Sequence, residues 1–143
     1  MLFRSVVYFL ALVVTLANVS APSHAQELSK DASLNGQKLT ITMESLDAGC
    51  KVEAKIAVNK TFCFRALVKG ASDAWLKDLT APKFDAVMPG HHHGMITRPK
   101  VNAIKPGEYL IEGVKLHMAG DWTINLNLRH GKDSAQVAIP LKL

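Results

Sequence analysis

Apolar and polar residues alternate along most of the chain after residue 26, and helical periodicity is hard to find there. The clearest run extends from Trp122 to Leu128, where every second residue is apolar and the residues between are polar or charged. A period of two is typical of a β-strand that buries one face. The same pattern predicts strands over residues 52–58, 62–68, 84–88, 114–118 and 135–143.

Turn-forming residues separate these runs. Asn59-Lys60 lies between the first two runs and predicts that they form a hairpin. Pro140 cannot donate a backbone hydrogen bond, so the last strand is expected at a sheet edge. A helical turn is expected over Ser72–Leu79. Further turns are predicted at Lys69-Gly70, Pro89-Gly90, Pro106-Gly107, 119–121 and 130–133.

Short strands at this spacing are typical of two antiparallel sheets packed as a sandwich. The sequence contains no internal repeat and no linker that would divide it. We therefore predict an all-β fold, an immunoglobulin-like antiparallel β-sandwich of about seven strands. Residues 26–143 are expected to form it as a single domain.

Residues 1–25 have the pattern of a secretory signal peptide. Arg4 supplies a positive charge, residues 6–14 are almost all apolar, and Ser23-His24-Ala25 places small residues where signal peptidase reads them. The apolar run is shorter than the roughly 20 residues of a membrane-spanning helix, which argues against an uncleaved anchor. We expect cleavage after Ala25 and a periplasmic protein.

The composition limits the classes of function. Of the 143 residues, 48% are apolar and 20% are charged, with a net charge of +5. These values fit a small globular domain and not a disordered tail or a multi-span membrane protein. The lysines and arginines are scattered, so no nucleic-acid-binding surface is predicted. Neither a G-x-S-x-G turn nor an H-E-x-x-H motif is present, and we therefore expect no enzyme activity.

The two cysteines, Cys50 and Cys63, are predicted to form a disulfide. An even number of cysteines in an oxidising compartment favours this pairing, which would close a loop of about fourteen residues. The competing use is as metal ligands. A blue-copper site needs a histidine close after its cysteine, and the next histidine after Cys63 is His91.

The candidate chemistry lies in the segment Met88-Pro89-Gly90-His91-His92-His93-Gly94-Met95. Imidazole suits Cu(II) and thioether sulfur suits Cu(I), so this mixture of side chains points to copper. In an extended loop His91 and His93 would point to one side and His92 to the other. A second cluster, His117-Met118, adds one imidazole and one sulfur at the end of a predicted strand.

The same residues also have a purely structural interpretation. Strand alternation places Met88 with Phe84 and Ala86, and methionine commonly fills gaps in protein cores. His117 falls with Lys115 on the solvent side, where it is free to bind a metal or to do nothing. A solvated histidine loop between two strands is an ordinary feature, and both interpretations stay open at this point.

Taken together, these residues resemble the YtkA-like family of small exported bacterial domains. The resemblance covers roughly residues 50–130 and implies an immunoglobulin-like fold related to FixH-like and CopC-like domains, a periplasmic location and a link to copper. It also implies a metal site at His91, His93, Met95, His117 and Met88. The residues that support it are Asp85-Ala86-x-Met88-Pro89-x-His91-x-His93-Gly94-Met95, Pro99, Val101, Gly107-x-Tyr109, Gly113, His117-Met118-x-Gly120 and Trp122.

Two functions follow. The first is a monomeric periplasmic copper-binding protein that holds the ion or delivers it to a membrane-bound copper-handling or oxidase-assembly protein. Because imidazole must be neutral to bind metal, copper binding should fade below about pH 6, given an ordinary histidine pKa of about 6.5. The alternative is a structural or interaction module of the cell envelope. It would dock on a membrane-bound partner without metal, and the histidine turn would be a rigid corner.

Overall fold

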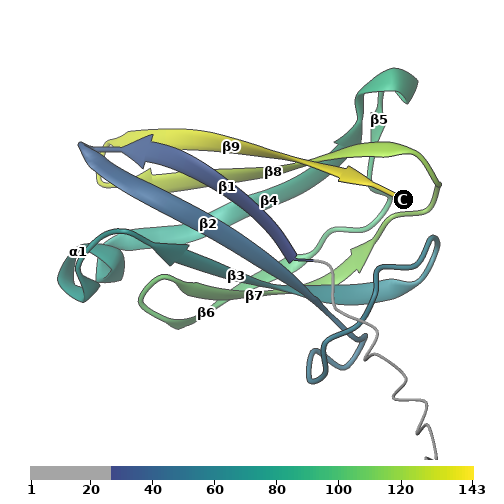
Figure 1. Ribbon diagram of the computed structural model, residues 1–143, viewed down its shortest axis with the longest axis horizontal. Coiled ribbons are helices and arrows are strands. Elements are labelled where there is room, and N and C mark those ends of the chain that lie inside the picture. The colour runs from purple at the N-terminus through teal and green to yellow at the C-terminus, as the bar shows by residue number, and fades with distance from the viewer. Residues whose placement is uncertain (1–26) are drawn as a thin grey trace, which may run out of the picture.

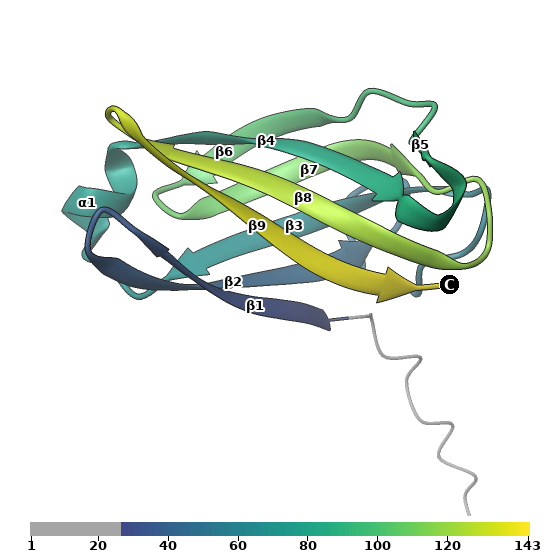
Figure 2. The same ribbon diagram turned by 90° about the horizontal axis from the view of Figure 1, so that it is seen from above.

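Two antiparallel β-sheets pack face to face as a sandwich (Figures 1 and 2). The computed structural model describes residues 27–143, so the predicted signal peptide over residues 1–25 lies outside the described residues. The first sheet consists, in spatial order, of β1 (Glu27–Leu34), β2 (Gln37–Leu46), β3 (Thr61–Lys69), β7 (Glu108–Lys115) and β6 (Lys100–Lys105). The second consists of β5 (His93–Gly94), β4 (Leu79–Met88), β8 (Asp121–His130) and β9 (Asp133–Lys142).

This architecture confirms the predicted immunoglobulin-like sandwich. The described part of the chain has five strands in one sheet and four in the other, where the sequence predicted about seven in total. One of the additional strands, β5, is only two residues long. Strand β9 lies at the edge of its sheet, as Pro140 predicted.

The core lies between the sheets because alternate residues of each strand point inward. In β8 the four apolar residues from Trp122 to Leu128 are all buried, as their alternation predicted. The first sheet contributes Ile41 of β2, Phe64 of β3 and Ile111 of β7 to the same core, and all three are fully buried. A one-residue slip of a strand would expose its whole apolar face, so burial fixes the register of each pairing.

A short helix, α1 (Asp73–Lys77), connects β3 to β4 at one end of the sandwich (Figure 1). Ser72 caps it, because its hydroxyl accepts a hydrogen bond from the backbone N–H of Trp75 at 3.3 Å. The helical turn predicted over Ser72–Leu79 is therefore confirmed. The Trp75 ring stacks on His130 with ring centres 4.2 Å apart, which ties the helix to the end of β8.

The predicted hairpin between residues 52–58 and 62–68 is wrong. Residues 62–68 lie in β3, but residues 54–60 form no strand, and of the four alternating apolar residues only Ile56 is in the core. Val52 is 64% exposed. The physical reason is that β3 already has a hydrogen-bonded neighbour on each side, β2 and β7, which leaves no free edge for this segment.

The hydrophobic alternation did not predict the β1–β2 hairpin, whose second strand is the neighbour of β3 on one side. Its strands meet at Asn35-Gly36, and both residues have positive φ angles, 50° and 76°. Asn-Gly is a strong sequence signal for a two-residue hairpin turn because these residues tolerate positive φ at low cost. The turn chemistry therefore carried the information that hydrophobic alternation alone did not.

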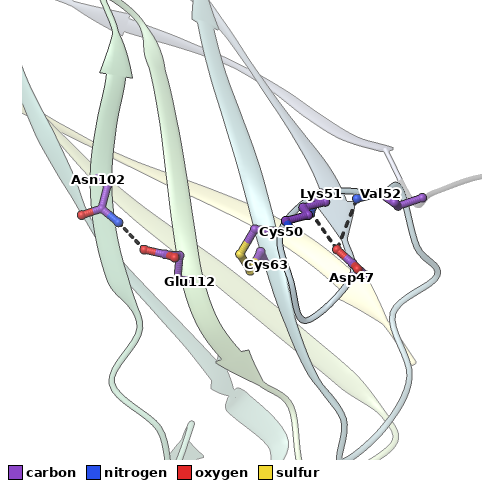
Figure 3. The surroundings of a disulfide bond; sticks show 7 residues. All are labelled: Asp47, Cys50, Lys51, Val52, Cys63, Asn102 and Glu112. Atoms are coloured by element: carbon purple, nitrogen blue, oxygen red, sulfur yellow. Dashed lines mark hydrogen bonds between the residues drawn. A yellow bond between two sulfur atoms is a disulfide. The ribbon is translucent and has the colours of Figure 1, made fainter.

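The predicted disulfide between Cys50 and Cys63 is present, with Cα atoms 5.3 Å apart (Figure 3). It joins the irregular segment after β2 to strand β3. Cys63 and its cross-strand partner Leu46 are each 1% exposed although neither belongs to the main core cluster. The disulfide thus fastens the loop near the ends of β2 and β3, where these two side chains are buried.

Asp47 is the first residue after β2, and its side chain holds the start of the same loop through hydrogen bonds. One carboxylate oxygen accepts hydrogen bonds from the backbone N–H groups of Lys51 at 2.8 Å and Val52 at 3.2 Å (Figure 3). These hydrogen bonds lower the pKa of Asp47 from its ordinary value of 3.8, because they stabilise the ionised form. The stabilisation is present above that ordinary value and is lost as the pH falls through the lower pKa of the folded state.

We expect Asp47→Asn to reveal this dependence on pH. At pH 7 the variant should unfold at a lower urea concentration than the wild type, because a neutral amide accepts these hydrogen bonds more weakly than a carboxylate. As the pH falls below the ordinary value of 3.8 and through the lower pKa of the folded state, the difference in midpoint should shrink, because Asp47 becomes protonated. A difference in midpoint that stays constant between pH 7 and pH 2 would contradict this role.

Candidate metal centre at one end of the sandwich

The predicted site residues lie at the end of the sandwich opposite to α1 (Figure 1). Strand β4 ends at Met88 and is followed by a 3-10 turn, η1 (Pro89–His91). The chain then reverses, and β5 pairs with the end of β4, with Met88 opposite His93 and Val87 opposite Gly94. The segment between β7 and β8 ends at this same side of the molecule, because β8 pairs with β4.

The reversal depends on Pro89 and His92. Proline is favoured at the start of a helical turn because its φ is already fixed and its missing N–H is not needed there. His92 adopts the left-handed conformation (φ 53°) and donates its backbone N–H to the carbonyl of Pro89 at 3.4 Å. This left-handed residue separates His91 from His93, and it has none of the ring contacts that join their side chains.

Three imidazole rings come together around His93. Its ring centre lies 5.8 Å from that of His91 and 5.1 Å from that of His117. A histidine nitrogen bonds a metal at about 2.0–2.1 Å, so two rings on one tetrahedral ion have centres roughly 5 Å apart. The observed separations are close to this value. The fold thus places the His117 ring beside the loop histidine His93. We call the side chains of His91, His93 and His117 the histidine cluster.

The hydrogen bonds of the cluster leave nitrogen atoms available. Nδ1 of His93 lies 3.2 Å from the carbonyl oxygen of Gly94, and because a carbonyl only accepts, this contact requires a proton on Nδ1. Nε2 of the neutral ring then carries the lone pair that a metal needs. Metal-binding histidines commonly donate their other N–H to a backbone carbonyl in this way.

His117 has an unsatisfied polar atom. Its Nδ1 is buried and has no hydrogen-bond partner among the described residues. A buried polar atom without a partner costs roughly 1–3 kcal/mol, so such an atom is unusual and needs an explanation. A ligand in contact with the His117 ring would supply one.

Trp122 packs edge-on against two members of the cluster. Its ring centre lies 6.1 Å from His93 and 5.7 Å from His117, at interplanar angles of 71° and 77°. Its indole N–H donates to the carbonyl of Met118 at 2.9 Å, which fixes the orientation of the ring. The alternation over residues 122–128 predicted that Trp122 is buried, and the family resemblance includes it, but neither predicted its contacts with the imidazole rings. Trp122 is the second residue of β8 and follows closely after His117 in the sequence. This position was the sequence signal that its ring could contact the histidine cluster.

Met88 is the most buried of the predicted site residues, whereas Met95 is half-buried like His93 and His117. Met88 is 1% exposed and belongs to the core, where its terminal methyl lies against Gly120. Met95 is partly buried and packs against the same core, and its backbone N–H donates to Ala86 at 3.0 Å. The burial of Met88 favours the packing interpretation of that side chain. His91 is exposed, and His93, His117 and Met95 are half-buried.

An open groove of about 560 Å³ begins beside the cluster. Its lining includes His91 and Trp122, and Pro140 and Lys142 near the end of β9. Within residues 27–143, no three His, Cys, Asp or Glu side chains are disposed to hold a metal ion as they stand. The three rings are neighbours, and rotation of their side chains is required before their nitrogen atoms share one point.

The comparison with known families identifies the type of domain. The family model described as YtkA-like matches residues 42–127, which include the whole histidine cluster and Trp122. The chain belongs to the YtkA-like family. YtkA-like domains are not a known enzyme family.

The other comparisons add no relative. No curated protein and no solved structure matches the chain. Among the described residues of this YtkA-like domain, no helix is both long enough and apolar enough to cross a membrane.

Proposed function

We propose that this YtkA-like domain binds copper on His91, His93 and His117. The observation that supports the proposal is the spacing of the three rings, 5.8 Å and 5.1 Å from the central His93. Imidazole is a good ligand for Cu(II), and the unpartnered Nδ1 of His117 leaves one ring nitrogen in need of a ligand. Rotation of exposed or half-exposed side chains costs little compared with the metal bonds formed.

The same proposal places the protein in the periplasm, where it holds the ion or delivers it in copper homeostasis or oxidase assembly. The signal-peptide pattern of residues 1–25 and the Cys50–Cys63 disulfide support an oxidising compartment. Delivery requires a membrane-bound copper-handling or oxidase-assembly protein as acceptor. An exposed loop site suits transfer because a second protein reaches the ion directly.

Met95 is assigned a secondary role. A thioether favours Cu(I), so Met95, two residues after His93, would shift the preference of the site toward the reduced ion. Met88 is not included in the proposed ligand set because it is 1% exposed. Binding of Cu(I) that depends on Met95 would extend the site to both oxidation states.

A titration that compares two histidine variants tests the assignment. We expect His117→Ala to weaken Cu(II) binding about a hundredfold or more, since loss even of a group that only supports a ligand costs 10–100-fold. His92→Asn is the matched control, because asparagine also tolerates the left-handed conformation and His92 lies outside the cluster. Its affinity should equal that of the wild type. Fluorescence of Trp122 reports binding, because Cu(II) quenches a nearby indole.

The outcome also decides between the two functions. If His117→Ala and His92→Asn bind Cu(II) as the wild type does, the histidine cluster is not the site. The loop is then a rigid corner that packs on Trp122, and the domain acts as an interaction module of the envelope. Trp75→Phe should be used as background for the fluorescence measurement, so that the signal comes from Trp122 alone.

A further inference from the structure

A second group of polar side chains lies on the outer face of the second sheet, at the other end of β4 and β8. There a hollow of about 250 Å³ is open to solvent, and it shares no residue with the histidine cluster. Its polar lining consists of Thr80, Lys83, Asn127, Arg129, Lys132 and Ser134.

A β-bulge in β4 brings these side chains to one face. Thr80 pairs with Arg129 and Lys83 pairs with Asn127, so β4 has one more residue than β8 between the two pairs. Strict alternation would place Thr80 and Lys83 on opposite faces. With the bulge both are exposed on the outer face, while Pro82 between them is buried. Bulges of this kind commonly redirect a side chain next to a functional site.

Arg129 occupies the middle of a row of three strands. Its cross-strand neighbours are Thr80 on β4 and Ser134 on β9, which place a hydroxyl on each side of the guanidinium group. Directly opposed residues have Cβ atoms about 4.5–5.5 Å apart, so these groups reach a common ligand. Nε of Arg129 donates to the carbonyl of Gly131 at 3.1 Å, which holds the guanidinium at the turn and leaves its terminal N–H groups available.

The charges of the hollow are not neutralised within the described part of the chain. Lys83, Arg129 and Lys132 have no carboxylate within ion-pair distance there. The nearest acids in the sequence, Asp85 and Asp133, do not line this hollow. Asp85 lies in an adjacent hollow that Lys83 and Asn127 also line, and one of its oxygens accepts a hydrogen bond from the N–H of Ala86 at 2.8 Å. Three cations that share one hollow repel one another, and a bound anion would remove this cost.

We propose that this hollow binds a phosphate-type oxyanion, either free or as the phosphate of a lipid headgroup. The donor set fits this class of ligand, since arginine offers paired N–H donors to a phosphate and the lysines add positive charge. The hydroxyls of Thr80 and Ser134 and the amide of Asn127 supply further donors. The site is independent of copper binding and of the groove beside His91.

The test measures binding of two phosphate sources to the purified protein. Inorganic phosphate is titrated at constant ionic strength against chloride, and backbone amide shifts around residues 80, 127, 129 and 134 are followed by NMR. In a separate arm, the protein is mixed with vesicles of phosphatidylglycerol or of phosphatidylcholine and sedimented. Arg129→Gln removes the central donor, and Lys30→Gln on β1 is the matched control that removes one charge from the other sheet.

We expect Arg129→Gln to weaken binding about tenfold or more, because hydrogen bonds to charged groups are the strong ones, whereas Lys30→Gln retains wild-type binding. Saturable binding of inorganic phosphate that is lost in Arg129→Gln would support a site for the free ion. Binding only to phosphatidylglycerol vesicles, lost in the same variant, would support the headgroup. Equal binding by both variants, or no saturable response to either probe, would overturn the proposal.

Discussion

Replacement of Trp122 by alanine is expected to lower the free energy of unfolding by about 3–5 kcal/mol, the usual cost of removing a buried tryptophan or phenylalanine. The side chain is 1% exposed, packs in the core and contacts the rings of both His93 and His117. Its removal leaves a cavity between the core and the histidine cluster, and it also leaves the carbonyl of Met118 without its indole donor. Urea unfolding followed by circular dichroism measures the loss.

The second tryptophan provides the control for this prediction. Trp75 is only partly buried, packs against the margin of the core and stacks on His130, so Trp75→Ala should cost clearly less than Trp122→Ala. A loss below 1 kcal/mol for Trp122→Ala, or equal losses for the two variants, would show that Trp122 does not support this end of the sandwich as described.

Removal of the disulfide is expected to cost about 3 kcal/mol on the chain-entropy model, given the short loop that it closes. Cys50 and Cys63 are 13 residues apart in sequence, and before β3 begins at Thr61 the loop between them has only an isolated bridge from Glu53 to Leu46 as strand pairing among the described residues. The double variant Cys50→Ser/Cys63→Ser should therefore unfold at lower urea than the wild type, and the wild type should move to the same midpoint when a reductant is added.

The double serine variant is the control for the effect of the reductant. The reductant should not change the midpoint of this variant, which has no other cysteine to react. An unchanged midpoint for the reduced wild type would mean that the loop is held by its other contacts, such as the hydrogen bonds to Asp47.

Alternation predicted the fold wherever a strand buries one face over its whole length. Residues of β8 and β9 follow this pattern, and Pro140 correctly placed β9 at an edge. The segment 52–58 has the same alternation and forms no hairpin with β3. Whether residues 52–58 pair with β3 does not depend on their own sequence, because β2 already occupies that edge of β3. The Asn35-Gly36 turn of the β1–β2 hairpin lies some 25 residues before β3 in the sequence.

The candidate site was predictable in its residue types and not in its geometry. The composition of the histidine loop identified it, and His117 was identified as part of a second cluster at the end of a predicted strand. Sequence spacing did not show that His93 is the central ring or that Trp122 lies against two imidazoles, because both depend on the pairing of β5 with β4. Met88 has a thioether that is suitable as a metal ligand, but the fold buries this side chain in the core.

The cationic hollow was not predictable from the scattered basic residues. Lys83 and Arg129 are far apart in sequence and are brought together by the β4–β8 pairing. The bulge at residues 80–83 then turns both flanking side chains of β4 to the same face. Scattered charges in a sequence thus do not exclude a local cluster in an antiparallel sheet.

The most direct test of copper binding is a competitive titration of the purified protein, with its disulfide formed, against chelators of known affinity. Cu(I) and Cu(II) are titrated separately into the wild type and into the double variant His91→Ala/His93→Ala. We predict one-to-one binding by the wild type and its loss in the variant, while the circular dichroism spectrum of the variant remains that of a folded β-domain. Full affinity in the variant, or only weak and non-stoichiometric binding by the wild type, would contradict the assignment of the histidine cluster as a copper site.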